Sequence, residues 1–460
     1  MSLTSVAAPD RRCQRNARTA RMATIATAHA PNIFLPLRFV AVALLALAAA
    51  AAWLVIEPTL ITDYHYGPHA VALTHLLLLG FAASVVMGVV YQLAPVALEA
   101  RLHSERLARV QFCFHVIGVA GMVWMFRKWD VRQVGHFGSV FAIGVILFVF
   151  NIVRTLLRVP RWNVVAFGIA SAVGWLLVTM LAGLFLACAK CWPWITPFEP
   201  LAEMHAHAHL GGLGIFVMLT VAVAYRLVPM FAVSEIQNHR RAVWSIALLD
   251  IGVAGLAATI LIRSPWKLAF AFVSIAGLAL FALELVAILR ARKRRTLDWG
   301  LRYFLTGAGF LAPLSLLAIV LCWPGLPATR ITAQFENAYA IFAVLGVLAF
   351  AMLGMLYKIL PFLVWFHRYS PEIGRGRVPT LAEMPSSRLQ AIGYALHLPG
   401  VLIAAAASVL GHTRCATLAA VLIAASALIF AINAVLIGSH LLRRRVAEPP
   451  VAIRPMPASA

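Results

Sequence analysis

Charged side chains are scarce in this sequence, and acidic side chains are the scarcest of all. Only 12% of the 460 residues are charged, with 16 Asp and Glu against 38 Lys and Arg, whereas 62% are hydrophobic. Soluble domains carry about 25% charged residues, so this composition excludes a soluble domain of this length. The chain also lacks a phosphate-binding loop, a dinucleotide fingerprint and a Ser-His-Asp arrangement at useful spacing, which leaves no signature of those enzyme classes.

Long apolar runs take the place of the missing charge, and the mean hydropathy is +0.90. Each run has about 20 residues, enough for a helix to cross about 30 Å of hydrocarbon. We expect twelve membrane-spanning helices, here called spans 1 to 12, near residues 35–56, 71–95, 107–126, 136–157, 162–188, 205–230, 241–263, 266–290, 301–322, 336–361, 388–410 and 416–442. The predicted fold class is an all-α polytopic membrane protein.

The net charge of +22 comes mainly from Lys and Arg in alternate connections between the spans. Such a distribution is typical of the positive-inside rule rather than of nucleic-acid binding. It predicts a multi-pass protein of the bacterial inner membrane with both termini in the cytoplasm, the lipid bilayer as its main partner and no nucleic-acid partner. We expect a basic disordered cytoplasmic N-terminus at 1–30, a membrane domain at 31–445 and a disordered cytoplasmic tail at 446–460.

One spaced pattern recurs inside the apolar runs. The reading H-x4-G-x10-Y-x3-P occurs twice, and its tail occurs a third time without the histidine. The copies are His75, Gly80, Tyr91 and Pro95, then His209, Gly214, Tyr225 and Pro229, then Gly346, Tyr357 and Pro361, at nearly equal intervals along the chain. Repetition at a nearly fixed period predicts three related blocks of spans. We expect the glycines to allow close helix packing and the tyrosines to anchor the inner membrane interface.

Histidines near the outer ends of spans 2 and 6 are the strongest site candidates. Imidazole is costly to bury in a membrane and is a common ligand of metals and haem iron. His75, with His207 or His209, offers paired nitrogens at one depth for a b-type haem, and His115 with His397 offers a second pair. The alternative for each histidine is a hydrogen-bonded packing role.

The run His205-Ala-His207-Ala-His209 has its own geometry. On a helix His205 and His209 share a face, whereas His207 points roughly 160° away. His205 and His209 are therefore candidate copper ligands together with His69 or Glu203 in the same outer layer. The alternative is an interfacial cluster solvated at the outer face.

Two further pairs of residues carry weaker signals. Asp250 in span 7 and Glu284 in span 8 are buried carboxylic acids by position, and they indicate either a proton route or single hydrogen bonds between helices. Cys188 and Cys191 form C-x2-C at the outer end of span 5. We predict a disulfide in an oxidising periplasm, with copper binding as the alternative.

The arrangement of spans and histidines resembles the haem-copper oxidase subunit I superfamily. Twelve spans in three blocks and histidines near the outer ends of spans 2 and 6 carry the resemblance, together with the run from His205 through Leu-Gly-Gly-Leu-Gly to Ala224-Tyr-Arg-Leu-Val-Pro229. The sequence is most similar to the branch of cbb3-type oxidases and nitric oxide reductases and its divergent NnrS-type relatives.

The resemblance implies haem b, copper and electron transport with oxygen or nitric oxide chemistry. It also implies a cytochrome c-type or other redox subunit at the outer face, and any enzyme would be an oxidoreductase. The family takes further ligands from spans 10 and 7. Here Ile341 occupies the repeat-histidine position of span 10, and span 7 offers Asp250 instead of a histidine pair. A metal or haem transporter or assembly factor on the same scaffold is the alternative function.

Overall fold

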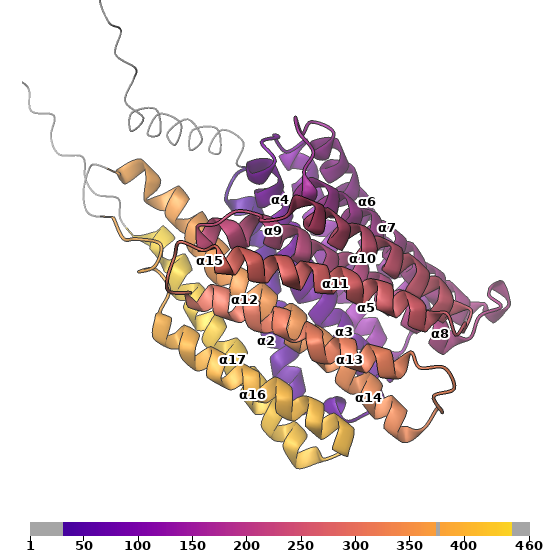
Figure 1. Ribbon diagram of the computed structural model, residues 1–460. Helices are drawn as coiled ribbons and strands as arrows, with labels where there is room; N and C mark the ends of the chain where they lie inside the picture. Colours follow the sequence, from indigo (N-terminus) through magenta and orange to yellow (C-terminus); the bar gives the residue numbers. More distant parts are fainter. Residues whose placement is uncertain (1–30, 374–377, 444–460) are drawn as a thin grey trace, which may run out of the picture.

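A computed structural model describes residues 31–373 and 378–443, and every regular element in these two ranges is a helix. The helix axes are roughly aligned with one another, and the helices form a single bundle (Figure 1). The predicted N-terminal segment 1–30 and tail 446–460 lie outside the described residues, as do residues 444–445 at the end of the predicted membrane domain.

Twelve helices within the described residues are long and apolar enough to cross a membrane, as the sequence predicts. They are Phe34–Ile56, Pro68–Ala97, Glu105–Lys128, Val131–Leu156, Val164–Cys191, Pro200–Ala232, His239–Leu261, Lys267–Arg290, Trp299–Leu321, Arg330–Arg368, Ser387–Leu410 and Thr413–Leu442. Each predicted apolar run lies almost wholly within one of them. Spans 6 and 10 are the most deeply buried in the bundle.

Spans 2, 6 and 10 share an irregularity at the repeated pattern. A π-helix of eight residues follows each repeat position directly, as η2 (Leu76–Ala83), η4 (Leu210–Val217) and η5 (Phe342–Ala349). The α-helices after them, α4 (Ser84–Ala97), α9 (Met218–Ala232) and α15 (Phe350–Arg368), each contain the repeat proline. π-helices are rare, so three at equivalent positions show that the blocks share one structure.

Each block consists of four consecutive spans with the same order of packing. Its first span, α2 (Phe34–Ile56), α7 (Val164–Cys191) or α12 (Trp299–Gly309), packs on its second span, and its third and fourth spans form a helical hairpin. The hairpins are α5 (Glu105–Lys128) with α6 (Val131–Leu156), α10 (His239–Leu261) with α11 (Lys267–Arg290), and α16 (Ser387–Leu410) with α17 (Thr413–Ser439). The first and last spans are neighbours because α17 packs on α2, which closes the bundle.

Polar residues set the starts of many helices. Ser104, Asn163 and Asn238 accept hydrogen bonds from backbone N–H groups in the first turns of α5, α7 and α10. These N–H groups have no partner within the helix itself. The caps explain why the helices begin beside short polar connections rather than at the first apolar residue.

Close glycine contacts hold two of the hairpins together. A Cβ at Gly118 would lie 2.5 Å from the backbone nitrogen of Phe141, and one at Gly252 would lie 2.8 Å from the backbone nitrogen of Ser274. Real Cβ contacts are longer than this, so only glycine permits these backbones to approach so closely. The packing role predicted for the repeat glycines is confirmed at Gly80 and Gly214, where an added Cβ would lie 2.8 Å from a side-chain carbon of Ala46 or Trp175.

The repeat tyrosines correct the sequence-based expectation. They are not interface anchors, because Tyr91, Tyr225 and Tyr357 are all buried. The hydroxyl groups of Tyr91 and Tyr225 bond to equivalent residues of the following span, Gln111 at 3.3 Å and Ser245 at 2.7 Å. A buried phenol with a partner on the next helix links two spans, so this part of the repeat is structural.

Candidate functional site

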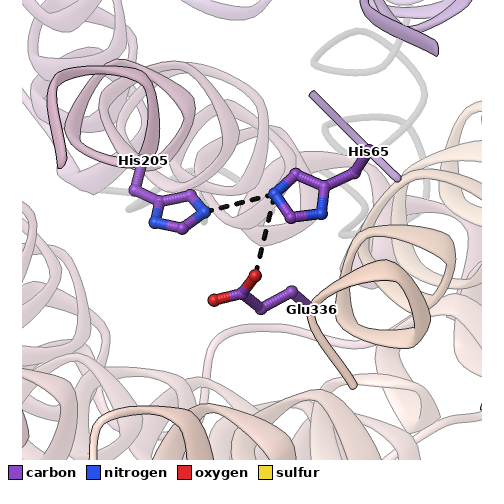
Figure 2. Close-up of side chains that lie close together, drawn as sticks. All are labelled: His65, His205 and Glu336. Atoms are coloured by element: carbon purple, nitrogen blue, oxygen red, sulfur yellow. Dashed lines mark hydrogen bonds and ion pairs between the residues drawn. The ribbon is translucent and has the colours of Figure 1, made fainter. Parts of the chain in front are cut away.

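The three blocks meet at the end of the bundle where spans 2, 6 and 10 begin. We call this end the His65 face. His65 lies in the connection before α3 (Pro68–His75), His205 lies in α8 (Pro200–His209) and Glu336 lies in α14 (Arg330–Ile341). Figure 2 shows the three side chains pointing toward one another from separate segments. The Nε2 atoms of His65 and His205 are 3.4 Å apart, and the Nε2 of His65 is 3.7 Å from an oxygen of Glu336.

Asn337 fixes the orientation of the His65 ring. Its amide nitrogen donates to the carbonyl oxygen of Asp63 at 2.7 Å, so its amide oxygen faces the Nδ1 of His65 at 3.0 Å. That oxygen can only accept, so Nδ1 carries the proton and Nε2 keeps its lone pair. Burial lowers the pKa of His65, and this effect exceeds the opposite effect of the Asn337 hydrogen bond. The imidazole is therefore neutral at pH 7.

Exposed residues continue from this cluster into the bundle. Ala208 lies three residues beyond His205 and Ala340 lies four residues beyond Glu336, so each pair shares a helix face. Ala208 and Ala340 are exposed, as is Thr74 at the equivalent position of span 2. A Cβ added at Gly212 would meet no atom within 4 Å. These positions of spans 2, 6 and 10 are therefore not covered by neighbouring side chains.

The exposed surface ends farther along the same spans. Phe81, Ile215 and Val347 occupy equivalent positions in η2, η4 and η5, and each is buried. η5 contacts both η2 and η4. At this depth, apolar side chains therefore fill the space between the three central helices.

The repeat histidines lie below the His65 face and make the same hydrogen bond. The Nδ1 of His75 is 2.8 Å from the carbonyl oxygen of Val71, and the Nδ1 of His209 is 2.7 Å from that of His205. A carbonyl oxygen can only accept, so each Nδ1 is protonated and each Nε2 presents a lone pair. This is the tautomer that second-shell bonds impose on ligand histidines.

His207 of span 6 is related by the repeat to His75 of span 2 as Tyr339 of span 10 is related to His209. The ring of His207 rests on Gly183 of α7, where an added Cβ would lie 3.0 Å from Cε1. The buried Nδ1 of His207 has no hydrogen-bond partner. Buried polar atoms are seldom left unpaired, so this nitrogen is a candidate ligand atom.

The same relationship between adjacent blocks recurs once more with different side chains. Tyr339 of span 10 occupies the position equivalent to His207, and its ring stacks on His209 with centroids 5.9 Å apart. Its hydroxyl lies 3.4 Å from the Nε2 of His209. In the third block the histidine position holds Ile341, which packs in an apolar cluster with Leu73. The structure therefore brings His209 together with Tyr339, and the repeat predicts the same relationship between His75 and His207.

His115 and His397 occupy equivalent positions in spans 3 and 11, and each is engaged within its own block. The Nε2 of His115 is 2.8 Å from the hydroxyl of Ser84, and the Nε2 of His397 is 3.1 Å from the carbonyl oxygen of Leu345. Leu345 lies in η5, where the wider helical turn changes the backbone bonding. These contacts favour the packing role for His397, whereas the buried Nδ1 of His115 has no hydrogen-bond partner, so the predicted haem pair stays a prediction.

The structure assembles a different outer metal candidate from the predicted set of His205, His209 and His69. The Nδ1 of His69 lies 2.7 Å from a carboxylate oxygen of Glu57, away from the cluster. His209 uses its Nδ1 on the His205 carbonyl, and Glu203 accepts a hydrogen bond from Thr196. Only His205 of the predicted set belongs to the group that could hold a metal ion in the described part of the chain.

Asp250 and Glu284 each have local partners. Asp250 accepts hydrogen bonds from the hydroxyl of Ser171 and from the indole nitrogen of Trp175, the latter at 2.8 Å. These contacts favour the alternative of bonds between helices, here spans 7 and 5.

Glu284 has a capping role in its own block. One of its oxygens accepts from the backbone nitrogens of Gln237 at 2.6 Å and Asn238 at 3.0 Å, and the other lies 3.3 Å from the Arg241 guanidinium. It therefore holds the start of α10, and the proton route stays a hypothesis.

The predicted disulfide is not formed in this structure. Cys188 and Cys191 both lie in the last turn of α7 and carry free thiols. The helix extends farther than the apolar run predicts, so the two residues are three apart on a regular helix rather than in a loop.

Glu336 and the partnership of His65 with His205 are the parts of the site that the sequence reading missed. The repeat itself contains a signal for them. Asn337 occupies in span 10 the repeat position that His205 occupies in span 6, so its neighbour Glu336 must begin span 10 at the same depth. In the sequence, His65 is part of a short polar stretch before span 2 and belongs to no repeated pattern. No family model and no curated protein matches this chain.

Proposed function

We propose that the protein is a divergent membrane protein of the haem-copper oxidase subunit I type that binds a b-type haem and works in electron transfer or in nitric oxide or oxygen chemistry. The proposal includes a bacterial inner membrane, cytoplasmic termini and a periplasmic His65 face. A cytochrome c-type or other redox subunit would dock at that face. Support comes from the excess of basic residues in alternate connections.

The proposal rests on one available ring nitrogen on each of two histidines, His75 and His207, which the repeat places in adjacent blocks. His75 offers an Nε2 lone pair, because its Nδ1 is bonded to Val71. His207 offers a buried Nδ1 without a partner. His75 and His207 would hold the iron of a b-type haem through these two nitrogens. When bound, a haem supplies a one-electron carrier, and the two histidines would set its potential and orientation.

An absorption spectrum of the purified protein tests this function. We expect a Soret band and split visible bands in the reduced parent protein, lost in the His75→Ala and His207→Ala variants. His136→Ala is the matched control, because His136 is an exposed histidine of α6 bonded only to Gln133. A colourless parent after expression with added haem precursor would contradict the proposal, as would full haem content in both site variants.

Transport or assembly of a metal or haem on the same scaffold is the second candidate. The specific observation in its favour is the exposed surface that runs from the His65 face past Ala208 and ends at Phe81, Ile215 and Val347. A site open at one end and closed at mid-depth suits one state of a transporter. Flux of a metal ion or haem into proteoliposomes, together with a colourless purified protein, would favour this function over the first.

A further inference from the structure

The His65 face carries a second, separate feature, the convergence of His65, His205 and Glu336. We propose that these three residues form a binding site for a divalent transition metal ion of the Zn²⁺ class, independent of haem binding deeper in the bundle. One ligand atom from each residue lies within 4.8 Å of the other two. Each of the three blocks contributes one residue, so the ion would join the blocks where they meet.

Two of the three separations between ligand atoms agree with tetrahedral coordination, and the third, between His205 and Glu336, is within 4.8 Å. In a zinc site with bonds of about 2.1 Å, neighbouring ligand atoms are about 3.4 Å apart. The two Nε2 atoms are 3.4 Å apart and the nearest nitrogen-to-oxygen distance is 3.7 Å. Two imidazoles and one carboxylate are also a known zinc ligand set that leaves a fourth position for water or substrate.

The surroundings prepare His65 for a metal in particular. Asn337 holds the Nδ1 proton of His65, and Asp63 holds Asn337 through its backbone oxygen. Nε2 therefore directs a lone pair toward His205 and Glu336, which is how second-shell partners orient ligand histidines. The rings of His65 and His205 are stacked at 24° with centroids 5.6 Å apart. The Nε2 atoms of the two rings therefore lie close together and have few other partners.

An ion can reach the site and can be exchanged. All three side chains are partly exposed, so solvent can reach the site and supply a fourth ligand. Imidazole and carboxylate together select borderline ions such as Zn²⁺ or Cu²⁺ over Ca²⁺ and Mg²⁺, which prefer oxygen ligands alone.

Zinc binding to the full-length purified protein in detergent tests the proposal. The probe is Zn²⁺ alone, measured by titration calorimetry and by metal content after dialysis. We expect one ion per chain, and we expect affinity to fall at least about tenfold in His65→Ala, His205→Ala and Glu336→Gln. Asn337→Leu, which removes only the partner of His65, should lower affinity about ten- to a hundredfold.

The matched control is His69→Ala, because His69 lies on the same face but bonds to Glu57. This variant should bind Zn²⁺ as the parent does. Size-exclusion profiles and thermal unfolding identify any variant that fails to fold, and Glu336→Gln keeps the size of the side chain. Co²⁺ bound at the site should give the intense visible bands of tetrahedral coordination, lost with His205→Ala.

Three outcomes would overturn the site: no Zn²⁺ bound by the parent, unchanged affinity in the folded triad variants, or equal loss in His69→Ala, which indicates adventitious surface binding. The haem spectrum is read separately from the same samples. A parent protein that binds Zn²⁺ but no haem would support this site and contradict the proposed function. A parent protein that binds haem but no Zn²⁺ would support only the proposed function.

Discussion

His75 and His209 lie in different blocks of the chain, yet each donates its Nδ1 proton to the carbonyl oxygen four residues earlier, at 2.8 and 2.7 Å. The position, the bond and the π-helix that follows are all repeated. The bond leaves Nε2 as the one lone pair on each ring. Only the neighbours differ, because the ring of His75 packs on Phe126 whereas the ring of His209 stacks on Tyr339.

The first prediction follows from this single available nitrogen at His75. A methionine sulfur can replace a histidine nitrogen as an axial haem ligand and raises the haem potential. We expect His75→Met to retain haem with a shifted spectrum and a higher midpoint potential, and His75→Leu to lose it. Redox titration followed by absorption measures both effects. Identical spectra for the Met, Leu and parent proteins would show that His75 is no ligand.

The second prediction concerns the glycine contacts. Gly118→Ala should destabilise the protein by about 1 to 3 kcal/mol, the usual cost of overpacking, because its Cβ would lie 2.5 Å from a backbone atom of Phe141. Gly400→Ala, the equivalent change in the third block, should cost less because the nearest atom is a side-chain carbon at 3.0 Å. Thermal unfolding in detergent compares them.

Gly174→Ala is the control for that series. Gly174 is an exposed position of α7, and an added Cβ meets nothing within 4 Å. Alanine has the better helix propensity, so this variant should be as stable as the parent or slightly more stable. If all three substitutions had equal effects, close packing would not be the reason for glycine at Gly118.

Much of the fold could be predicted from the sequence because membrane helices depend on local properties. Apolar length alone located the spans, and the spacing from His75 to Pro95 identified the blocks. The π-helices could not be predicted, since the segment after His75 is as apolar as any other span. The tyrosine prediction was wrong because Tyr91 has a partner, Gln111, twenty residues away on another helix.

The candidate site was less predictable because its residues come from distant parts of the chain. His205 and His209 lie within one helical turn of each other and suggest a shared site, but the Nδ1 of His209 is occupied by the His205 carbonyl. The partners that His205 does meet, His65 and Glu336, belong to the other two blocks and are far from it in the chain. Such a cluster depends on how three blocks meet, which no local pattern contains.

The third prediction separates a structural role of Glu284 from a proton route. Glu284→Ala removes the acceptor of two backbone N–H groups and the partner of Arg241. Each buried donor left unpaired costs about 1 to 3 kcal/mol, so the variant should unfold at a clearly lower temperature. Glu284→Gln keeps an acceptor oxygen for Gln237 and Asn238 and should recover most of this stability.

If Glu284 carries protons, proton uptake into proteoliposomes should not follow the stability of the two variants. Glutamine cannot carry a proton, so Glu284→Gln would then be as inactive as Glu284→Ala although it is stable. A stable and active Gln variant supports the capping role at the start of α10.

The last prediction is that dioxygen reduction coupled to proton pumping is absent. The resemblance implies haem ligands from span 10 and copper ligands from span 7, but the histidine position of span 10 holds Ile341 in an apolar cluster. In span 7, Asp250 is engaged by Ser171 and Trp175. The residues therefore cannot supply the set of two haems and one copper.

Oxygen consumption with a reduced donor, measured beside haem and copper content per chain, checks this prediction. We expect no steady turnover, even in preparations that contain haem. Steady turnover with two haems and one copper would require other nitrogens, and His115 and His397 are the buried candidates within spans 3 and 11. His397 would have to give up its bond to Leu345, whereas His115 could use its unpaired Nδ1. Loss of turnover in His115→Gln or His397→Gln would then show that the ligands have moved to spans 3 and 11.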